Sequence, residues 1–278
     1  MTSIAAEADE RNPDWRDSLL GSMRELWEFR ELFYYFAWRD IKVRYKQTVL
    51  GALWAIIQPL FTMLIFTFLF GKVAGISSDG IPRPLFYFSA LVPWTYFSAT
   101  VSNVSMTLLA NSDLLTKIYF PRVVLPGSVA LSGLLDFLIA STMLGVFFVY
   151  YEVAPGPNLL LWIPFALAMV ALALGVGMFL AALNVKYRDI KYAVPFGIQL
   201  WLFVTPIIYP LNSIPHQYRL FFAINPLSGI IEGFRRSLIP GMAIEWGAAT
   251  YSLVAAAAIF AIGAWFFNRS AKEFADYL

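Results

Sequence analysis

The chain has 278 residues, 59% hydrophobic and only 14% charged, whereas an average soluble domain is about 25% charged. Its net charge is +2, and it contains no cysteine, which excludes disulfides, thiol nucleophiles and cysteine metal sites. Several apolar runs of about 20 residues are each long enough to cross a bilayer core of roughly 30 Å. The composition therefore predicts an all-α integral membrane protein.

The first 48 residues contain charges throughout and no apolar core, so we expect no cleavable signal peptide. Residues 1–21 are polar and predict a loosely ordered cytoplasmic tail. Residues 22–48 carry apolar side chains at helical spacing among many charges, which predicts an amphipathic helix lying in the membrane interface. A soluble helix packed on another protein is the alternative. The apolar stripe consists of Leu26, Phe29, Phe33, Phe36, Ala37, Ile41 and Tyr45.

Residues 49–278 predict a domain with six transmembrane helices. The expected spans are 49–70, 85–109, 123–151, 159–183, 192–209 and 247–267. Small residues four apart in the fourth span (Ala171 with Gly175, Ala173 with Gly177) favour close helix packing. Asn111 or Ser112 can cap a short helix that Pro121 stops.

The segment between the fifth and sixth spans is too apolar for a solvated loop. It predicts two short helices, 214–222 and 226–239, with Asn225 as the N-cap and Pro226 as the first residue of the second. Helices of this length cannot span a membrane, so we expect both to be re-entrant in the outer leaflet.

Lys and Arg set the expected orientation. With a cytoplasmic N-terminus, 15 of the 20 Lys and Arg residues fall on the cytoplasmic side. The five outside are Lys72, Arg83, Arg219, Arg235 and Arg236. The distribution therefore predicts that both termini are cytoplasmic.

A short motif occurs twice. Arg39–Lys42 and Arg188–Lys191 both read Arg-Asp-Ile-Lys, and each precedes a span with a Trp five residues before a Pro. This repetition indicates two matched helices lining one path, although four residues recurring by chance is the alternative. The predicted path residues are Trp54, Phe61, Trp201, Phe203 and Tyr209. The predicted cytoplasmic gate consists of Arg39, Asp40, Lys42, Arg44, Arg188, Asp189 and Lys191.

The chain shows no catalytic motif. His216 is the only histidine, and no Gly-x-x-x-x-Gly-Lys-Ser/Thr run occurs, so another chain must supply any ATPase. Asp136 lies midway along the third span, where a charge costs roughly 3 kcal/mol. Two interpretations of Asp136 remain: a functional carboxylate, or a buried one bonded to a neighbouring helix. Glu232, Arg235 and Arg236 share one helical turn and form either a local salt bridge or an exit for the substrate.

Five ordered motifs resemble one family. They are Arg39–Trp54 with Gln58–Leu60, Lys117–Arg122, Asn184–Ile190, Thr205–Pro210 and Asn225–Arg235. Together they resemble the polysaccharide-export permeases of the type-2 ABC transporters, close to those for O-antigen, lipopolysaccharide and teichoic acid. The resemblance covers about residues 28–278.

The resemblance implies a homodimer of six-span subunits in the bacterial inner membrane. Two copies of a separate ATPase subunit would bind ATP and Mg, and this chain would hold no cofactor and bind no nucleic acid. The cargo would be an undecaprenyl-linked polysaccharide; a teichoic acid, a capsule or a small molecule are alternatives. A polyprenyl-phosphate glycosyl- or phosphotransferase is a rival that would need clustered acids or histidines.

The resemblance also implies roles for segments. The first and fifth spans would line the channel, and residues 226–239, with Glu232, Arg235 and Arg236, would lie near the exit. Residues 111–119 would form the coupling helix that docks in the ATPase. Its predicted contact residues are Asn111, Asp113, Leu114, Lys117 and Tyr119.

Overall fold

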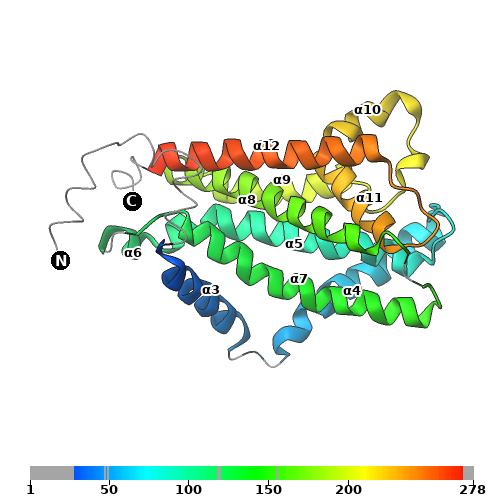
Figure 1. The fold of residues 1–278 in the computed structure, drawn as a ribbon, viewed down its shortest axis with the longest axis horizontal. Coiled ribbons are helices and arrows are strands. Elements are labelled where there is room, and N and C mark those ends of the chain that lie inside the picture. Colours follow the sequence, from blue (N-terminus) through cyan, green and yellow to red (C-terminus); the bar gives the residue numbers. More distant parts are fainter. Residues whose placement is uncertain (1–27, 47, 49, 118–119, 155, 272–278) are drawn as a thin grey trace.

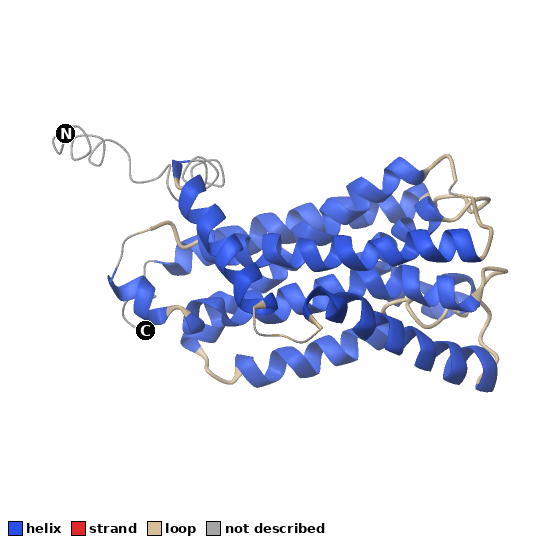
Figure 2. Ribbon diagram, turned by 90° about the horizontal axis from the view of Figure 1, so that it is seen from below, coloured by secondary structure: helices blue, strands red, loops and turns tan. Residues whose placement is uncertain are grey.

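The computed structural model describes residues 28–46, 48, 50–117, 120–154 and 156–271, in which long helices run side by side (Figures 1 and 2). The predicted tail 1–21 and residues 22–27 of the predicted interface helix lie outside this range. In chain order the elements are α3 (Arg30–Tyr45), η2 (Gly51–Leu53), α4 (Trp54–Phe66), η3 (Thr67–Val73), α5 (Arg83–Ala110), α6 (Ser112–Lys117), α7 (Val124–Tyr150), η4 (Leu159–Leu161), α8 (Trp162–Lys186), α9 (Ile190–Val204), η5 (Leu211–Ser213), α10 (His216–Ile224), α11 (Pro226–Leu238) and α12 (Trp246–Ala271).

Four stretches of the described chain are long and apolar enough to cross a membrane. They are Gly51–Val73, Val124–Tyr150, Leu159–Lys186 and Trp246–Ala271, and they match the predicted first, third, fourth and sixth spans. The all-helical, membrane-protein part of the prediction is therefore confirmed.

The predicted second span, α5, is as long as these helices but less apolar. Most of α5 is buried within the bundle, where Ser89 and Ser105 donate their hydroxyls to carbonyls of their own helix at 3.0 and 2.7 Å. Polar side chains whose hydrogen bonds are satisfied in this way can lie inside a helical bundle. The lower hydropathy of α5 therefore does not mean that the helix lies at the surface.

The predicted fifth span is helical only from Ile190 to Val204. Thr205 is extended (φ −106°, ψ 139°) because the following Pro206 disfavours the α conformation in the residue before it. Asn225 ties this break to α11: its amide donates to the Thr205 hydroxyl at 3.1 Å, and its carbonyl accepts from the Leu227 N–H at 3.1 Å. The predicted Asn225 cap with Pro226 at the first helical position is confirmed.

Glycines bring α8 into close contact with its neighbours. A Cβ on Gly175 would lie 2.6 Å from the carbonyl oxygen of Ile259 in α12, and one on Gly263 would lie 2.1 Å from that of Gly175. A Cβ on Gly177 would meet Val104 of α5 at 2.8 Å. The expected close packing of small residues in α8 is therefore confirmed.

The helix α3 lies obliquely against α7 (Figure 1). Phe36 and Ala37 are buried, whereas Tyr34, Tyr35 and Trp38 on the other side are 65, 63 and 46% exposed. The helix therefore buries one side within the chain and exposes aromatic side chains on the other, and its position in the membrane interface stays a prediction.

Candidate substrate path

Two helices present apolar stripes that the described residues of the single chain leave uncovered. On α9 the stripe is Tyr192, Phe196, Leu200 and Phe203, each more than half exposed. Its spacing of four, four and three residues places these side chains on one helical face. On α4 and η3 the corresponding stripe is Trp54, Phe61, Ile65 and Phe68, which are 52 to 61% exposed. Three predicted path residues, Trp54, Phe61 and Phe203, therefore belong to these stripes.

Trp201 lies off the α9 stripe. Its indole N–H donates to the side-chain oxygen of Asn225 at 3.1 Å, and its ring packs edge-on against Phe97 with centroids 5.2 Å apart. The structure thus places this predicted path residue between α9, α5 and α11.

Tyr209 and Phe203 help to line one cavity of about 620 Å³ beyond the end of α9. The Tyr209 hydroxyl donates to the carbonyl oxygen of Phe203 at 2.7 Å, and its ring packs edge-on against Phe222 of α10. Tyr218 and the loop after η3, including Gly75, complete part of the wall. An open cavity with several aromatic walls and tyrosine hydroxyls can contact both the apolar faces and the hydroxyls of sugar rings.

The predicted exit residues form a buried ionic cluster. Glu232 accepts from Arg235 at 2.7 Å and from Arg236 at 2.8 Å. Arg235 is fully buried, donates to the carbonyl oxygen of Pro206 and lies 3.9 Å from the ring centroid of Phe86. The cluster therefore joins α11 to α5 and to the segment after α9, as the local salt-bridge interpretation expects. A role at the exit stays a prediction.

The predicted gate and coupling residues meet at Arg39. Its guanidinium bonds Asp40 at 2.8 Å and the side-chain oxygen of Asn111 at 3.2 Å. The Asn111 amide in turn donates to the Thr107 carbonyl oxygen, so this side chain connects α3 to α5. The short helix α6 follows directly, with Asp113 and Lys117 exposed and Leu114 half-buried. Tyr119 lies outside the described residues.

The second copy of the basic motif lies at the turn between α8 and α9. Arg188, Asp189 and Lys191 are exposed there, and the Lys191 ammonium lies 4.8 Å from the ring centroid of Tyr192. Lys42, in the first copy, is also exposed and lies 5.5 Å from the ring of Trp38. These cations are accessible, but their role as a gate stays a prediction.

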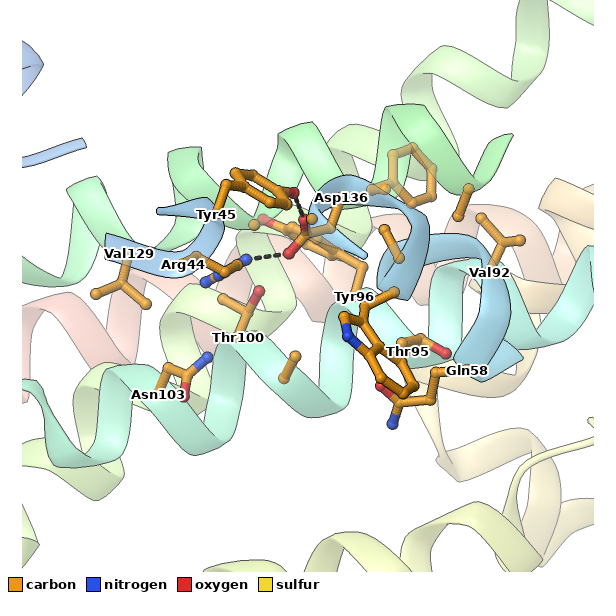
Figure 3. A pocket seen from close by; sticks show the side chains of 17 residues that line it. Arg44, Tyr45, Gln58, Val92, Thr95, Tyr96, Thr100, Asn103, Val129 and Asp136 are labelled. Carbon is orange, nitrogen blue, oxygen red and sulfur yellow. Dashed lines mark hydrogen bonds and ion pairs between the residues drawn. The ribbon is translucent and has the colours of Figure 1, made fainter. Parts of the chain in front are cut away.

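Arg44 is engaged differently from the other predicted gate residues. Its guanidinium pairs with Asp136 of α7, and the Tyr45 hydroxyl donates to the other oxygen of the same carboxylate (Figure 3). Burial and then this hydrogen bond raise the pKa of Tyr45. Asp136 is thus bonded to a neighbouring helix, as one of the two sequence interpretations expects. Sequence reasoning did not identify its partners, which lie 92 and 91 residues away.

A cavity of about 210 Å³ opens beside this pair. Its walls come from α4, α5 and α7, and the end of α3 closes one side. Figure 3 shows Gln58 and Thr95 toward one end and Asn103 and Thr100 toward the other, with Asp136 between. Sequence reasoning missed this cavity, although Gln58 and Asp136 both interrupt apolar runs.

The chain is similar to known transport proteins over most of its length. The family model described as ABC-2 type transporter matches residues 31–239. The chain is 33% identical over 216 residues to the O-antigen export system permease protein RfbA of Myxococcus xanthus, covering 77% of this chain and 82% of that one. It is 30% identical over 242 residues to RfbA of Klebsiella pneumoniae (86% and 92% covered), and 29% identical over 217 residues to the polysialic acid transport protein KpsM of Escherichia coli (74% and 81% covered).

Proposed function

This chain belongs to the ABC-2 type transporter family, and we propose that it is the membrane subunit of an ATP-driven exporter of a lipid-linked polysaccharide. The observation that carries the proposal is the similarity to O-antigen export permeases over 86% of this chain and 92% of the relative. The exposed aromatic stripes on α4 and α9 support it, because a glycan chain needs an extended path with aromatic and polar walls.

The proposed subunit has six spans with both termini in the cytoplasm. Four are the apolar stretches described above, and α5 and α9 supply the other two. A helix of 28 residues such as α5 is about 42 Å long, more than a bilayer core requires. The 15 residues of α9 reach only about 23 Å, and the buried segment Thr205–Ile208 completes the crossing. We propose that the two short helices that follow, α10 and α11, both re-enter the membrane from its outer face.

Export requires partners that this chain lacks. We propose a homodimer in which two copies of α4 and α9 enclose the path, with two ATPase subunits docking on α6 and its flanking residues. ATP and Mg bind to the ATPase subunits in this arrangement. Arg39 of α3 donates a hydrogen bond to Asn111, which directly precedes α6. A movement of α6 caused by the ATPase would therefore be transmitted to α3 through this hydrogen bond.

The cargo proposed first is an undecaprenyl-linked chain of the O-antigen type moving across the inner membrane. The similarity to KpsM, named for polysialic acid transport, makes a capsular polysaccharide the second candidate.

Deletion of the gene tests the proposal. We expect loss of a surface polysaccharide and accumulation of its lipid-linked precursor inside the cell, both reversed by the intact gene. An unchanged surface polysaccharide would contradict the proposal. Substitution of Asp113 and Leu114 should also uncouple export from ATP hydrolysis. Normal export in that variant would show that the ATPase does not dock on α6.

A further inference from the structure

The cavity beside Asp136 has mostly apolar walls, but polar side chains from α4, α5 and α7 also line it. Gln58 on α4 and Asn103 on α5 line it, are exposed in the single chain, and make no side-chain hydrogen bond to the described residues. Polar groups at membrane depth are costly unless they face protein partners, water or a ligand. These side chains therefore indicate that the cavity receives a polar group.

The charges around the cavity argue against an anionic ligand. Arg44 and Asp136 are the charged side chains among the described residues that line it, and they pair with each other. Tyr45 further satisfies the carboxylate. A phosphate would need uncompensated cations or several backbone N–H groups, and this lining offers neither a second Arg nor a Lys. The site is thus suited to a neutral ligand.

The walls combine aromatic rings with amides and hydroxyls. Trp54 is 55% exposed and lines the cavity together with Tyr96 and Phe137. The negative face of an aromatic ring attracts the C–H groups on the face of a sugar. Gln58 and Asn103 each offer two N–H donors and an acceptor, and Thr95 offers a hydroxyl, which suits the ring hydroxyls. The chemistry that fits all of these groups is a polyhydroxylated ring.

The size of the cavity limits the ligand. A volume of about 210 Å³ is below the roughly 300–1,000 Å³ of pockets that enclose drug-sized ligands. It has room for about seven water molecules, taking ~30 Å³ for each. A single ring or side branch fits, whereas an extended chain does not.

We propose that this cavity is a binding subsite for one neutral sugar residue of the exported chain, held within each subunit between α4, α5 and α7. The inference rests on the proposed function for the identity of the cargo. Trp54 belongs both to the exposed α4 stripe and to the cavity wall, so it connects the path between subunits with the subsite inside each one. The Arg44–Asp136 pair positions the end of α3 as the wall of the subsite.

Photo-crosslinking tests the subsite in the complete transporter. A photo-reactive amino acid with a small alkyl diazirine side chain replaces Ala99, which is exposed and lines the cavity, or Ala257, an exposed alanine of α12 outside it. The probe is the lipid-linked glycan extracted from the producing cells and labelled with a radioactive sugar. We expect capture of the labelled glycan at position 99 and none at position 257.

Two variants then examine the polar groups. With the crosslinker at position 99, Asn103→Leu and Thr95→Val should each lower capture about three- to tenfold, the loss expected for one hydrogen bond. Thr95→Val keeps the shape of the side chain, so it tests the hydroxyl even if Asn103→Leu fails to fold. Capture that neither variant changes would overturn the proposal.

Competition separates the subsite from its alternatives. We expect excess unlabelled glycan to abolish capture, and inorganic phosphate or phosphatidylglycerol vesicles to leave it unchanged. Capture abolished by phosphate or by the vesicles would assign the cavity to an anionic headgroup instead. No capture at position 99 in cells that still export glycan would reject the subsite and leave the proposed function intact, whereas normal surface glycan in the deletion strain would reject the proposed function.

Discussion

At the scale of single residues, Asp136 is a carboxylate in the middle of the 27-residue helix α7. An unpaired charge there costs roughly 3 kcal/mol, and Arg44 and Tyr45 offset this cost from α3. Both side chains of the ion pair are about one-third exposed (32% and 31%), so we expect the charge attraction to contribute only about 1 kcal/mol. Asp136→Asn, which keeps an acceptor for Tyr45, should therefore lower the thermal midpoint of the purified protein by about 2–4 °C.

A double-mutant cycle provides the control for this prediction. If the two charges act on each other, the effects of Arg44→Gln and Asp136→Asn will not add, and the double variant will resemble the more affected single one. Strictly additive effects would mean that each residue stabilises the fold through other contacts. The variant with both charges exchanged, Arg44→Asp with Asp136→Arg, should recover part of the decrease in thermal midpoint.

Trp201 also has a role that its position in the sequence does not reveal. The repeated motif predicts that it lines the path, yet its N–H bonds Asn225 and its ring packs on Phe97. We expect Trp201→Phe to cost about 1 kcal/mol of stability through the lost hydrogen bond, while Trp201→Ala also slows export because the break after α9 loses its support. Thermal midpoint and surface polysaccharide are measured together. Slowed export by Trp201→Phe at an unchanged midpoint would favour direct contact with the glycan.

At the scale of helices, the contact between α8 and α12 depends on the absence of side chains. A Cβ on Gly263 would overlap the backbone of Gly175 at 2.1 to 2.8 Å, and helix backbones cannot yield as a flexible side chain can. We expect Gly263→Ala to destabilise the purified protein by about 1–3 kcal/mol through overpacking. Gly145→Ala in α7 is the matched control, because no neighbouring helix among the described residues comes within 4 Å of a Cβ placed there. It should be neutral or slightly stabilising, since Ala favours the helix by about 1 kcal/mol; equal losses in both variants would contradict the packing argument.

The helices themselves follow from local patterns, whereas their contacts do not. Length and hydropathy predict the four apolar stretches, and the short-range preferences of Asn225 and Pro226 predict where α11 begins. The cavity, however, depends on Arg44 meeting Asp136 across 92 residues, and no periodicity encodes a pairing at that distance. The inward turn of Trp201 likewise depends on Asn225, 24 residues later. Local signals specify elements, and the interior of the bundle decides which polar side chains meet.

At the scale of the whole molecule, the stripes on α4 and α9 have two possible neighbours. Lipid and a second subunit both cover apolar side chains, so exposure alone does not distinguish them. The proposed homodimer places both stripes toward a two-fold axis, where a residue close to the axis meets its own copy. This arrangement makes the stripes, rather than the exposed face of α12, the place where two chains approach.

Cysteine crosslinking can decide between these neighbours, because the chain has no cysteine of its own. We expect at least one of the single variants Phe61→Cys, Phe68→Cys, Phe196→Cys and Leu200→Cys to form a covalent dimer in native membranes on mild oxidation. A disulfide requires the two Cα atoms to lie about 4.4–6.8 Å apart, so only positions next to the axis should react. Val254→Cys, at a 69% exposed position of α12, is the control and should remain monomeric. Covalent dimers formed only through position 254 would show that the subunits meet at α12 and that the stripes on α4 and α9 face lipid.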